Sequence, residues 1–301
     1  MTNIDVRLAA PVAGPPTLAD LLVHTTGGPK PGPGQVLVRN HWIALGAVQR
    51  TLMARGVLAA KSLGEVVGTG DLVTHTGPWS THVVADPAAL RPAGGTPDAA
   101  TAARLLGSAP VALAALRAAG LRAGETVLVT GAAGGLGSAA GAVARALGAG
   151  RVAGTTGSAW KVPLLTAGLG FDAAAGHASL AEAVERLGPA DVVVDTLGRV
   201  EELVAAVAPG TRIALCGALS QQLGGAADPR LDLTAVIFKR LTLVGATPGA
   251  DPGEELPAGL TLPYTVIEGL TEAPRALLDL FAGRHTGTVL VRVQGGADAD
   301  R

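Results

Sequence analysis

A run of glycines between two apolar segments is the part of this sequence best suited to chemistry. The apolar run from Thr126 to Thr130 stops at Gly131, an Ala-rich helical pattern continues to about Leu147, and further glycines stand between them at Gly134, Gly135 and Gly137. A strand, a tight turn and a helix N-terminus are expected here. Glycine lets a backbone approach a pyrophosphate, and the amides and dipole of a helix N-terminus favour its negative charge. The pattern matches the dinucleotide-binding fingerprint, and it also fits a tight strand–helix turn that holds no ligand.

The elements around this turn alternate between strand and helix. Apolar runs predict strands at 126–130, 151–154, 191–195, 211–216 and 241–245. Helical periodicity predicts helices at 98–106, 110–119, 136–147, 159–167, 180–187, 200–207 and 233–238. Such alternation predicts a doubly wound parallel sheet of the Rossmann type, with helices on both faces.

The first hundred residues have a different pattern, with short apolar segments between turns. Short strands are expected at 35–43, 65–68, 71–74 and 80–85, and 27–34 is a turn-rich connection. They predict an antiparallel, barrel-like β unit. After Gly249 the chain turns irregular, and a helix at 272–281 and a strand at 288–293 follow. We therefore expect three segments: a β domain at 1–100, a Rossmann domain at 101–250 and a return segment at 251–301.

Composition excludes several classes of protein. The chain has 301 residues, is 48% hydrophobic and carries a net charge of −1, which argues against disorder and against a nucleic-acid or membrane-surface partner. A single cysteine, Cys216, excludes an internal disulfide and a four-cysteine zinc site. The N-terminus lacks the features of a signal peptide, so a cytoplasmic protein with a small-molecule substrate is expected. The excess of Ala, Gly and Arg suggests a GC-rich bacterial genome.

Several stretches resemble one protein family. Gly131-Ala-Ala-Gly-Gly-Leu-Gly137 looks like its A/G-x-x-G-x-x-G loop, and Arg212-Ile-Ala-Leu-Cys-Gly-Ala-Leu-Ser220 resembles its R-I-A-x-C-G-x-I-S stretch. Residues 238–245 and 268–277 are also similar. The family is the zinc-independent double-bond reductases of the medium-chain dehydrogenase/reductase superfamily, with the prostaglandin, alkenal and quinone-type reductases. Over roughly 33 to 293, the resemblance implies a GroES-like β-barrel domain, a Rossmann domain and NADPH-dependent reduction of an activated C=C bond.

No metal is expected. Zinc-dependent relatives use a cysteine, a Gly-His-Glu motif and a further Cys or His. Here the motif reads Gly64-Glu65 without the histidine, and Cys216 falls in the other expected domain. Cys216 as a small buried hydrophobe is favoured over a ligand or nucleophile.

The end of the second Rossmann strand indicates the choice of cofactor. An NAD site usually places an acid there, but the sequence has none until Asp172 and offers Ser158 and Lys161 instead. A hydroxyl and a cation suit the 2′-phosphate of NADPH. In the resembled reductases these positions and a later tyrosine, here His177, hold that phosphate. Lys161 as a solvated helix residue, and His177 without a ligand, are the alternatives. The resemblance also implies that the cofactor site includes Cys216, Gly217, Ser220 and His285.

The substrate side departs from the family. Its active-site tyrosine in S-x-Y falls on Gln222, whose amide can donate to an oxyanion, and the single tyrosine, Tyr264, is the other candidate catalytic group. A second family tyrosine is missing near Pro110. Two hypotheses stay open. In one, hydride transfer is retained. In the other, the same fold catalyses a redox-silent cyclisation or isomerisation.

Two further expectations concern the β domain and assembly. Four aromatic or imidazole side chains are weaker candidates for the cleft, each more often packed or at the surface: His41, Trp42, Trp79 and His82. The strand at 241–245 is expected at a sheet edge that pairs with a second copy, as in the relatives, which predicts a homodimer.

Overall fold

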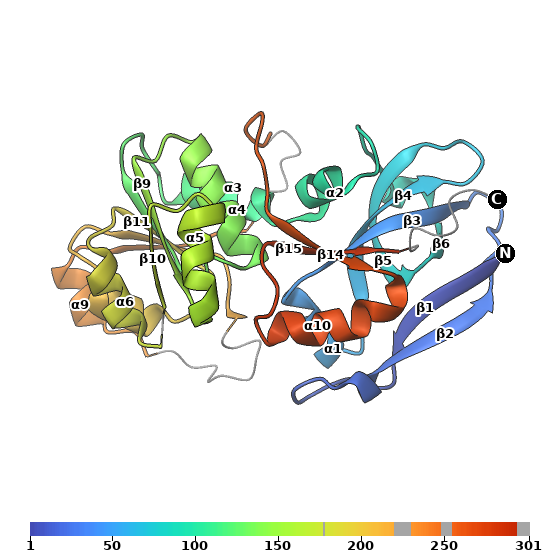
Figure 1. Cartoon of the computed structure of the whole chain (residues 1–301), viewed down its shortest axis with the longest axis horizontal. Coiled ribbons are helices and arrows are strands. Elements are labelled where there is room, and N and C mark those ends of the chain that lie inside the picture. Colours follow the sequence, from blue (N-terminus) through green and yellow to red (C-terminus); the bar gives the residue numbers. More distant parts are fainter. Residues whose placement is uncertain (177, 220–229, 248–254, 294–301) are drawn as a thin grey trace. The chain divides into compact units, whose positions relative to one another are not determined.

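The chain folds into two compact units, which are described separately. The computed structural model describes residues 1–176, 178–219, 230–247 and 255–293 (Figure 1). The first unit joins Met1–Gly107 to the segment that begins at Tyr264, and the second unit is Ser108–Pro263.

The second unit is built on a six-stranded parallel sheet with the order β10-β9-β8-β11-β12-β13. Its strands are β8 (Thr126–Val129), β9 (Arg151–Thr156), β10 (Ala173–Gly176), β11 (Val192–Asp195), β12 (Arg212–Leu215) and β13 (Thr242–Gly245). The central strands are continuous apolar runs, and Val127, Val129 and Val193 are fully buried. Such runs are typical of parallel strands covered on both faces.

Helices cover this sheet in two layers. They are α3 (Ala109–Ala118), α4 (Gly135–Ala146), α5 (Val162–Gly168), α6 (Leu180–Leu187), α7 (Val200–Ala206) and α9 (Leu233–Phe238). Helix α3 packs on α4, and α6 packs on α7. Leu180 and Val184 of α6 share a hydrophobic core with Leu203 of α7 and Ile213 of β12. The prediction of a doubly wound α/β sheet is confirmed.

The first unit is a curled, mixed sheet. Its strand order is β14-β15-β3-β4-β5-β1-β2, with β6 paired to β3 and β7 to β5. The strands are β1 (Thr2–Leu8), β2 (Leu21–Gly27), β3 (Val36–Leu45), β4 (Ala59–Val66), β5 (Leu72–Ser80), β6 (His82–Ala85), β7 (Arg91–Pro92), β14 (Tyr264–Glu268) and β15 (Thr288–Arg292). Only β14 and β15 pair in parallel; the other strands are antiparallel. This half-barrel agrees with the expected GroES-like domain.

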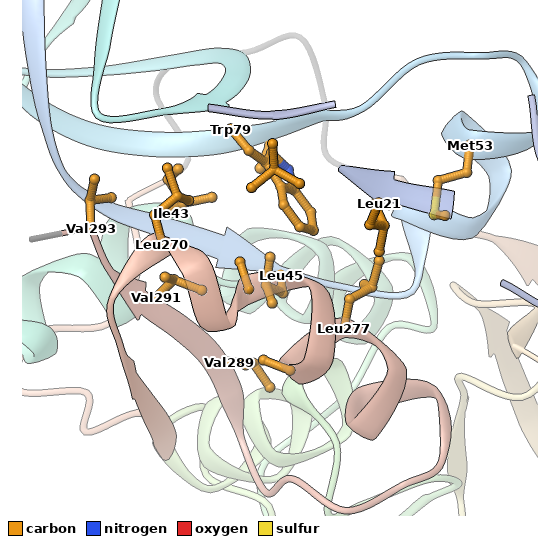
Figure 2. Packing of buried hydrophobic residues seen from close by; sticks show 14 of the residues in the cluster. Leu21, Ile43, Leu45, Met53, Trp79, Leu270, Leu277, Val289, Val291 and Val293 are labelled. Carbon is orange, nitrogen blue, oxygen red and sulfur yellow. The ribbon is translucent and has the colours of Figure 1, made fainter. Parts of the chain in front are cut away.

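Among the described residues of the first unit, the α-helices are α1 (Val48–Ala54), α2 (Ala99–Leu106) and α10 (Ala273–Phe281). Figure 2 shows the core that α1 and α10 help to close, in which Leu277 of α10 and Met53 of α1 share one cluster with Ile43, Trp79 and Val291. Strands distant in the sequence thus share one apolar interior, which joins the return segment to the N-terminal strands.

Some elements differ from the sequence-based expectation. The N-terminal hairpin of β1 and β2 and the edge strand β14 were not predicted. Much of β2 is exposed, including Leu22 and Val23, so its sequence does not alternate clearly. The helix expected at 159–167 begins as a 3₁₀ turn, η3 (Ala159–Lys161), and continues as α5. Pro163 explains the change, because proline is tolerated only in the first turn of an α-helix.

Among the described residues, no single helix has the length and apolar composition needed to span a membrane. Only the consecutive helices α2 and α3, taken as a bent pair, reach the length and composition of a span.

Candidate cofactor site

Two positions at the turn between β8 and α4 have room for glycine only. Gly131 has φ 59°, and a Cβ there would lie 2.6 Å from Oγ1 of Thr196. A Cβ on Gly137 would overlap the carbonyl oxygen of Gly131 and lie 2.7 Å from Cα of Ala132. Gly131 therefore permits the turn, and the absence of a Cβ at Gly137 lets the helix pack against it.

The N-terminus of α4 is open to an anion. Gly134 is its N-cap and Gly135 its first residue, and among the described residues no side chain caps it. A Cβ on Gly134 would meet nothing closer than the Gly131 carbonyl oxygen, at 3.5 Å. The first amides of a helix point outward along its axis and lack partners within the helix. These features fit a pyrophosphate approaching the backbone at this turn.

A buried polar network fixes the end of β11 to the end of β8. Oδ1 of Asp195 accepts a hydrogen bond from Oγ1 of Thr130 at 2.8 Å, and the Thr196 amide donates to that same Oγ1 at 2.9 Å. The Asp195 carboxylate also accepts the amides of Leu197 and Gly198. Burial raises the pKa of Asp195, while these hydrogen bonds act in the opposite direction. This network is not predicted from the sequence, although Thr130 and Asp195 stand at the carboxyl ends of two strands that are neighbours in the sheet.

Cys216 and Gly217 follow β12 at the same edge of the sheet. The Cys216 thiol donates to the carbonyl oxygen of Asp195, with 3.3 Å between sulfur and oxygen. Burial, and then the charge of Asp195, raises the pKa of Cys216 to about 12. The thiol is therefore held protonated, as expected for a residue that is no nucleophile. A Cβ on Gly217 would lie 2.9 Å from Cα of Thr196, so this position also requires a small residue.

Ser158 and Lys161 stand just beyond the carboxyl end of β9, as the sequence predicted. The Ser158 amide donates to Oγ1 of Thr156 at 3.4 Å. Lys161 is only 4% exposed, and its ammonium lies 5.2 Å from the ring centroid of Trp160. Desolvation lowers the pKa of Lys161. The alternative of an ordinary solvated helix residue is therefore wrong.

Asp172, the first acid after β9, lies at the wrong end of that strand to bind a ribose. Its carboxylate accepts the amide of Val152, at the start of β9, at 2.7 Å, and it also pairs with Arg145. The Val152 hydrogen bond is the main cause of the lowered pKa of Asp172, with Arg145 acting in the same direction. An acid in this place cannot contact a 2′-hydroxyl at the carboxyl end of β9.

Of the other residues assigned to the site, the structure describes only Tyr264 and His285. Tyr264 opens β14 in the first unit and is 42% exposed. His285 lies 3.2 Å, by Nε2, from the carbonyl oxygen of Ala276 in α10. His177, Ser220 and Gln222 lie outside the described residues. All these roles stay predictions.

The weaker candidates of the β domain are buried or have polar partners within the first unit. Trp79 is fully buried in the core of the first unit (Figure 2), and the ring nitrogen of Trp42 donates to the Pro97 carbonyl oxygen. His41 pairs with Glu65, which also binds Arg39. His82 is buried beside Thr81. Within the described ranges, no three His, Cys, Asp or Glu side chains lie together as a metal site.

Comparison with known proteins places these features in a family. Residues 135–262 match the family described as "Zinc-binding dehydrogenase". The chain is 28% identical over 318 residues to prostaglandin reductase 1 of Rattus norvegicus, covering 93% of this chain and 95% of the relative. It is 28% identical over 338 residues to the putative NADP-dependent oxidoreductase YfmJ of Bacillus subtilis, covering 96% and 97%.

A solved structure agrees with the fold. The structure of CurA from Vibrio vulnificus in complex with NADPH superposes with a TM-score of 0.84 at 22% identity, covering 97% of this chain and 99% of that one. With the glycine turn, the open end of α4 and the two-unit fold, these similarities lead to one conclusion. The chain belongs to the medium-chain dehydrogenase/reductase superfamily, where its relatives include prostaglandin and alkenal reductases and quinone oxidoreductases.

Proposed function

We propose that the protein is an NADPH-dependent reductase of an activated C=C bond, with an enone, enoyl or quinone-type substrate. The observation that carries this is the end of β9, where Ser158 and a buried Lys161 stand and the first acid is turned to the opposite end of the strand. An NADP-dependent relative and a fold neighbour in complex with NADPH support it.

Different residues would bind different parts of the cofactor. The turn at Gly134 and the first amides of α4 would hold the pyrophosphate, and Ser158 and Lys161 would hold the 2′-phosphate. When bound, the reduced nicotinamide supplies a hydride to the β-carbon of the substrate. A proton from solvent would complete the C–H bond at the α-carbon, so that one hydride and one proton are added across the C=C bond.

A donor is needed where negative charge develops on the substrate oxygen. Gln222 occupies the place of the family's tyrosine in the sequence, and we propose its amide as that donor. Tyr264, exposed in the first unit, is the second candidate and carries the only phenol of the chain. The amide can stabilise an oxyanion but supplies a proton less readily than a phenol.

The test is NADPH oxidation by the wild-type protein with a panel of enones and quinones, with NADH as comparator. Gln222→Ala should slow turnover by about a hundred- to thousand-fold, the usual effect of losing one oxyanion donor, and change cofactor affinity little. Gln221→Ala removes the neighbouring amide and is the matched control. Turnover in Gln222→Ala equal to the control would remove Gln222 from the mechanism.

A redox-silent cyclase or isomerase is the second candidate, favoured by one observation. The chain has a single tyrosine, so the two tyrosines of the resembled active site are absent. Binding of NADPH without oxidation across the whole panel would overturn the reductase proposal. Conversion of a substrate without any cofactor would establish the second candidate.

A further inference from the structure

Trp160 is exposed where a tryptophan would ordinarily be covered. It is 55% exposed, whereas the other two tryptophans, Trp42 and Trp79, are 3% and 0% exposed. Single apolar residues at a surface need no explanation by themselves. The place of Trp160 does call for one, because it lies in η3 between Ser158 and Lys161.

The burial of Trp160 and Lys161 is reversed, because a tryptophan is ordinarily covered and a lysine ordinarily exposed. Lys161 is 4% exposed and its neighbour, the indole, is open to solvent. The ammonium lies over the ring, 5.2 Å from its centroid, which is cation–π geometry. This contact restrains the indole beside the predicted 2′-phosphate site while more than half of Trp160 stays uncovered.

The other aromatic residues of the second unit are unsuited to contact a ligand here. Phe171 is buried, and a Cβ on Gly154 would lie 2.9 Å from its ring. Phe238 is exposed but belongs to α9, which packs on α7 and is followed in the chain by β13. The strand order puts β13 at the opposite edge of the sheet, four strands beyond β9. Trp160 is therefore the one described aromatic side chain of this unit that is both open and next to β9.

We propose that the exposed indole of Trp160 is the surface on which the adenine ring of the cofactor stacks. This inference rests on the proposed function. In NADPH the 2′-phosphate and the adenine are carried by the same ribose, so a phosphate bound at Ser158 and Lys161 brings the adenine within reach of the residue between them. Aromatic side chains stack with any base, since every base has a π-face.

Stacking and phosphate binding predict different selectivities. An adenine on Trp160 would strengthen every adenosine ligand, with or without the 2′-phosphate. The Lys161 ammonium would strengthen only those that carry the phosphate. Comparing adenosine 2′,5′-bisphosphate with adenosine 5′-monophosphate separates the two contributions without any nicotinamide.

The experiment is calorimetric titration of the full chain with these two probes and with NADPH. Trp160→Ala should weaken both adenosine probes by about ten-fold, within the usual range for loss of one base–aromatic stack, and Trp160→Phe should recover part of the affinity. Leu164→Ala, which trims another exposed apolar residue of the same segment, is the matched control and should bind as wild type. In wild type the bisphosphate should quench tryptophan fluorescence, and Trp160→Phe should abolish the quenching, because the remaining tryptophans are buried.

Three results would overturn the inference. Unchanged affinity of Trp160→Ala for both probes would refute stacking and leave the NADPH proposal intact. A loss confined to the phosphate-bearing probe would mean that the indole only orients Lys161. Absence of any binding by the wild-type protein would refute the cofactor assignment itself, and the stacking with it.

Discussion

The glycine turn allows a prediction in which two substitutions three residues apart have different effects. In Gly137→Ala the new Cβ would overlap the carbonyl oxygen of Gly131 and lie 2.7 Å from Cα of Ala132. Both are backbone atoms, so the turn must open to accept the methyl group. In Gly134→Ala the nearest atom is 3.5 Å away, and φ −79° and ψ 174° suit alanine. The first change should destabilise the fold, and the second should not.

Overpacking of this kind typically costs about 1–3 kcal/mol. For domains of roughly 150–250 residues each kcal/mol lowers the melting temperature by about 2–4 °C, so Gly137→Ala should melt about 2–12 °C below wild type. Gly134→Ala should melt close to wild type but bind NADPH more weakly, because its methyl group occupies the surface that a pyrophosphate approaches. Differential scanning calorimetry and NADPH titration measure the two effects separately.

The reasoning would be refuted by either of two results. Gly137→Ala melting as wild type would mean that the turn relaxes without cost. Gly134→Ala with full NADPH affinity would mean that the pyrophosphate does not approach this turn.

Four further predictions concern the cofactor, the thiol, the metal and the assembly. Lys161→Ala should weaken NADPH by roughly 10- to 150-fold, from about 1.5–3 kcal/mol for a hydrogen bond to a charged group, and leave NADH unchanged; equal wild-type affinities would contradict this. The pKa of Cys216, about 12 instead of an ordinary value near 8.5, lowers its thiolate fraction at pH 8 by roughly three orders of magnitude, so iodoacetamide should label the chain by mass spectrometry only after denaturation. The protein should purify without stoichiometric zinc, and elemental analysis that finds one tightly bound zinc per chain would oppose it. We propose a homodimer through β13 and α9, whose Ile237 and Phe238 are 69% and 79% exposed; Phe238→Asp should yield monomers by light scattering, and a monomeric wild type at micromolar concentration would refute it.

The sequence predicted the central strands β8 and β11 well because they are largely buried, but it missed the edge strand β10. Helix α9 has the predicted bounds, and β8 and β11 differ from prediction by a residue. Continuous apolar runs and glycines at turns carry this information locally. In the first unit, by contrast, β2 is largely exposed and β14 follows a proline, so their sequences resemble loops. Pairing with β1 and β15 makes them strands, and such partners are not visible in a local pattern.

The same distinction applies within the cofactor site. The positions of Ser158 and Lys161 could be predicted because they directly follow a recognisable strand. The burial of Lys161 and its contact with Trp160 could not, since both depend on packing. The hydrogen bond from Thr130 to Asp195 joins residues 65 positions apart and requires the strand order.

In the proposed activity, the cofactor site can therefore be recognised in the sequence more readily than the substrate site. A pyrophosphate contacts backbone amides, so its site requires glycine at fixed places, and the packing at Gly131 and Gly137 shows why other residues fail there. A substrate contacts side chains, and an oxyanion accepts a hydrogen bond from an amide or a phenol alike. A glutamine at position 222 in place of the family's tyrosine would therefore require no change in the glycine turn or in the network at Asp195. The proposed cofactor binding and the proposed hydride transfer thus depend on different residues, so NADPH affinity and NADPH oxidation should respond separately to substitution.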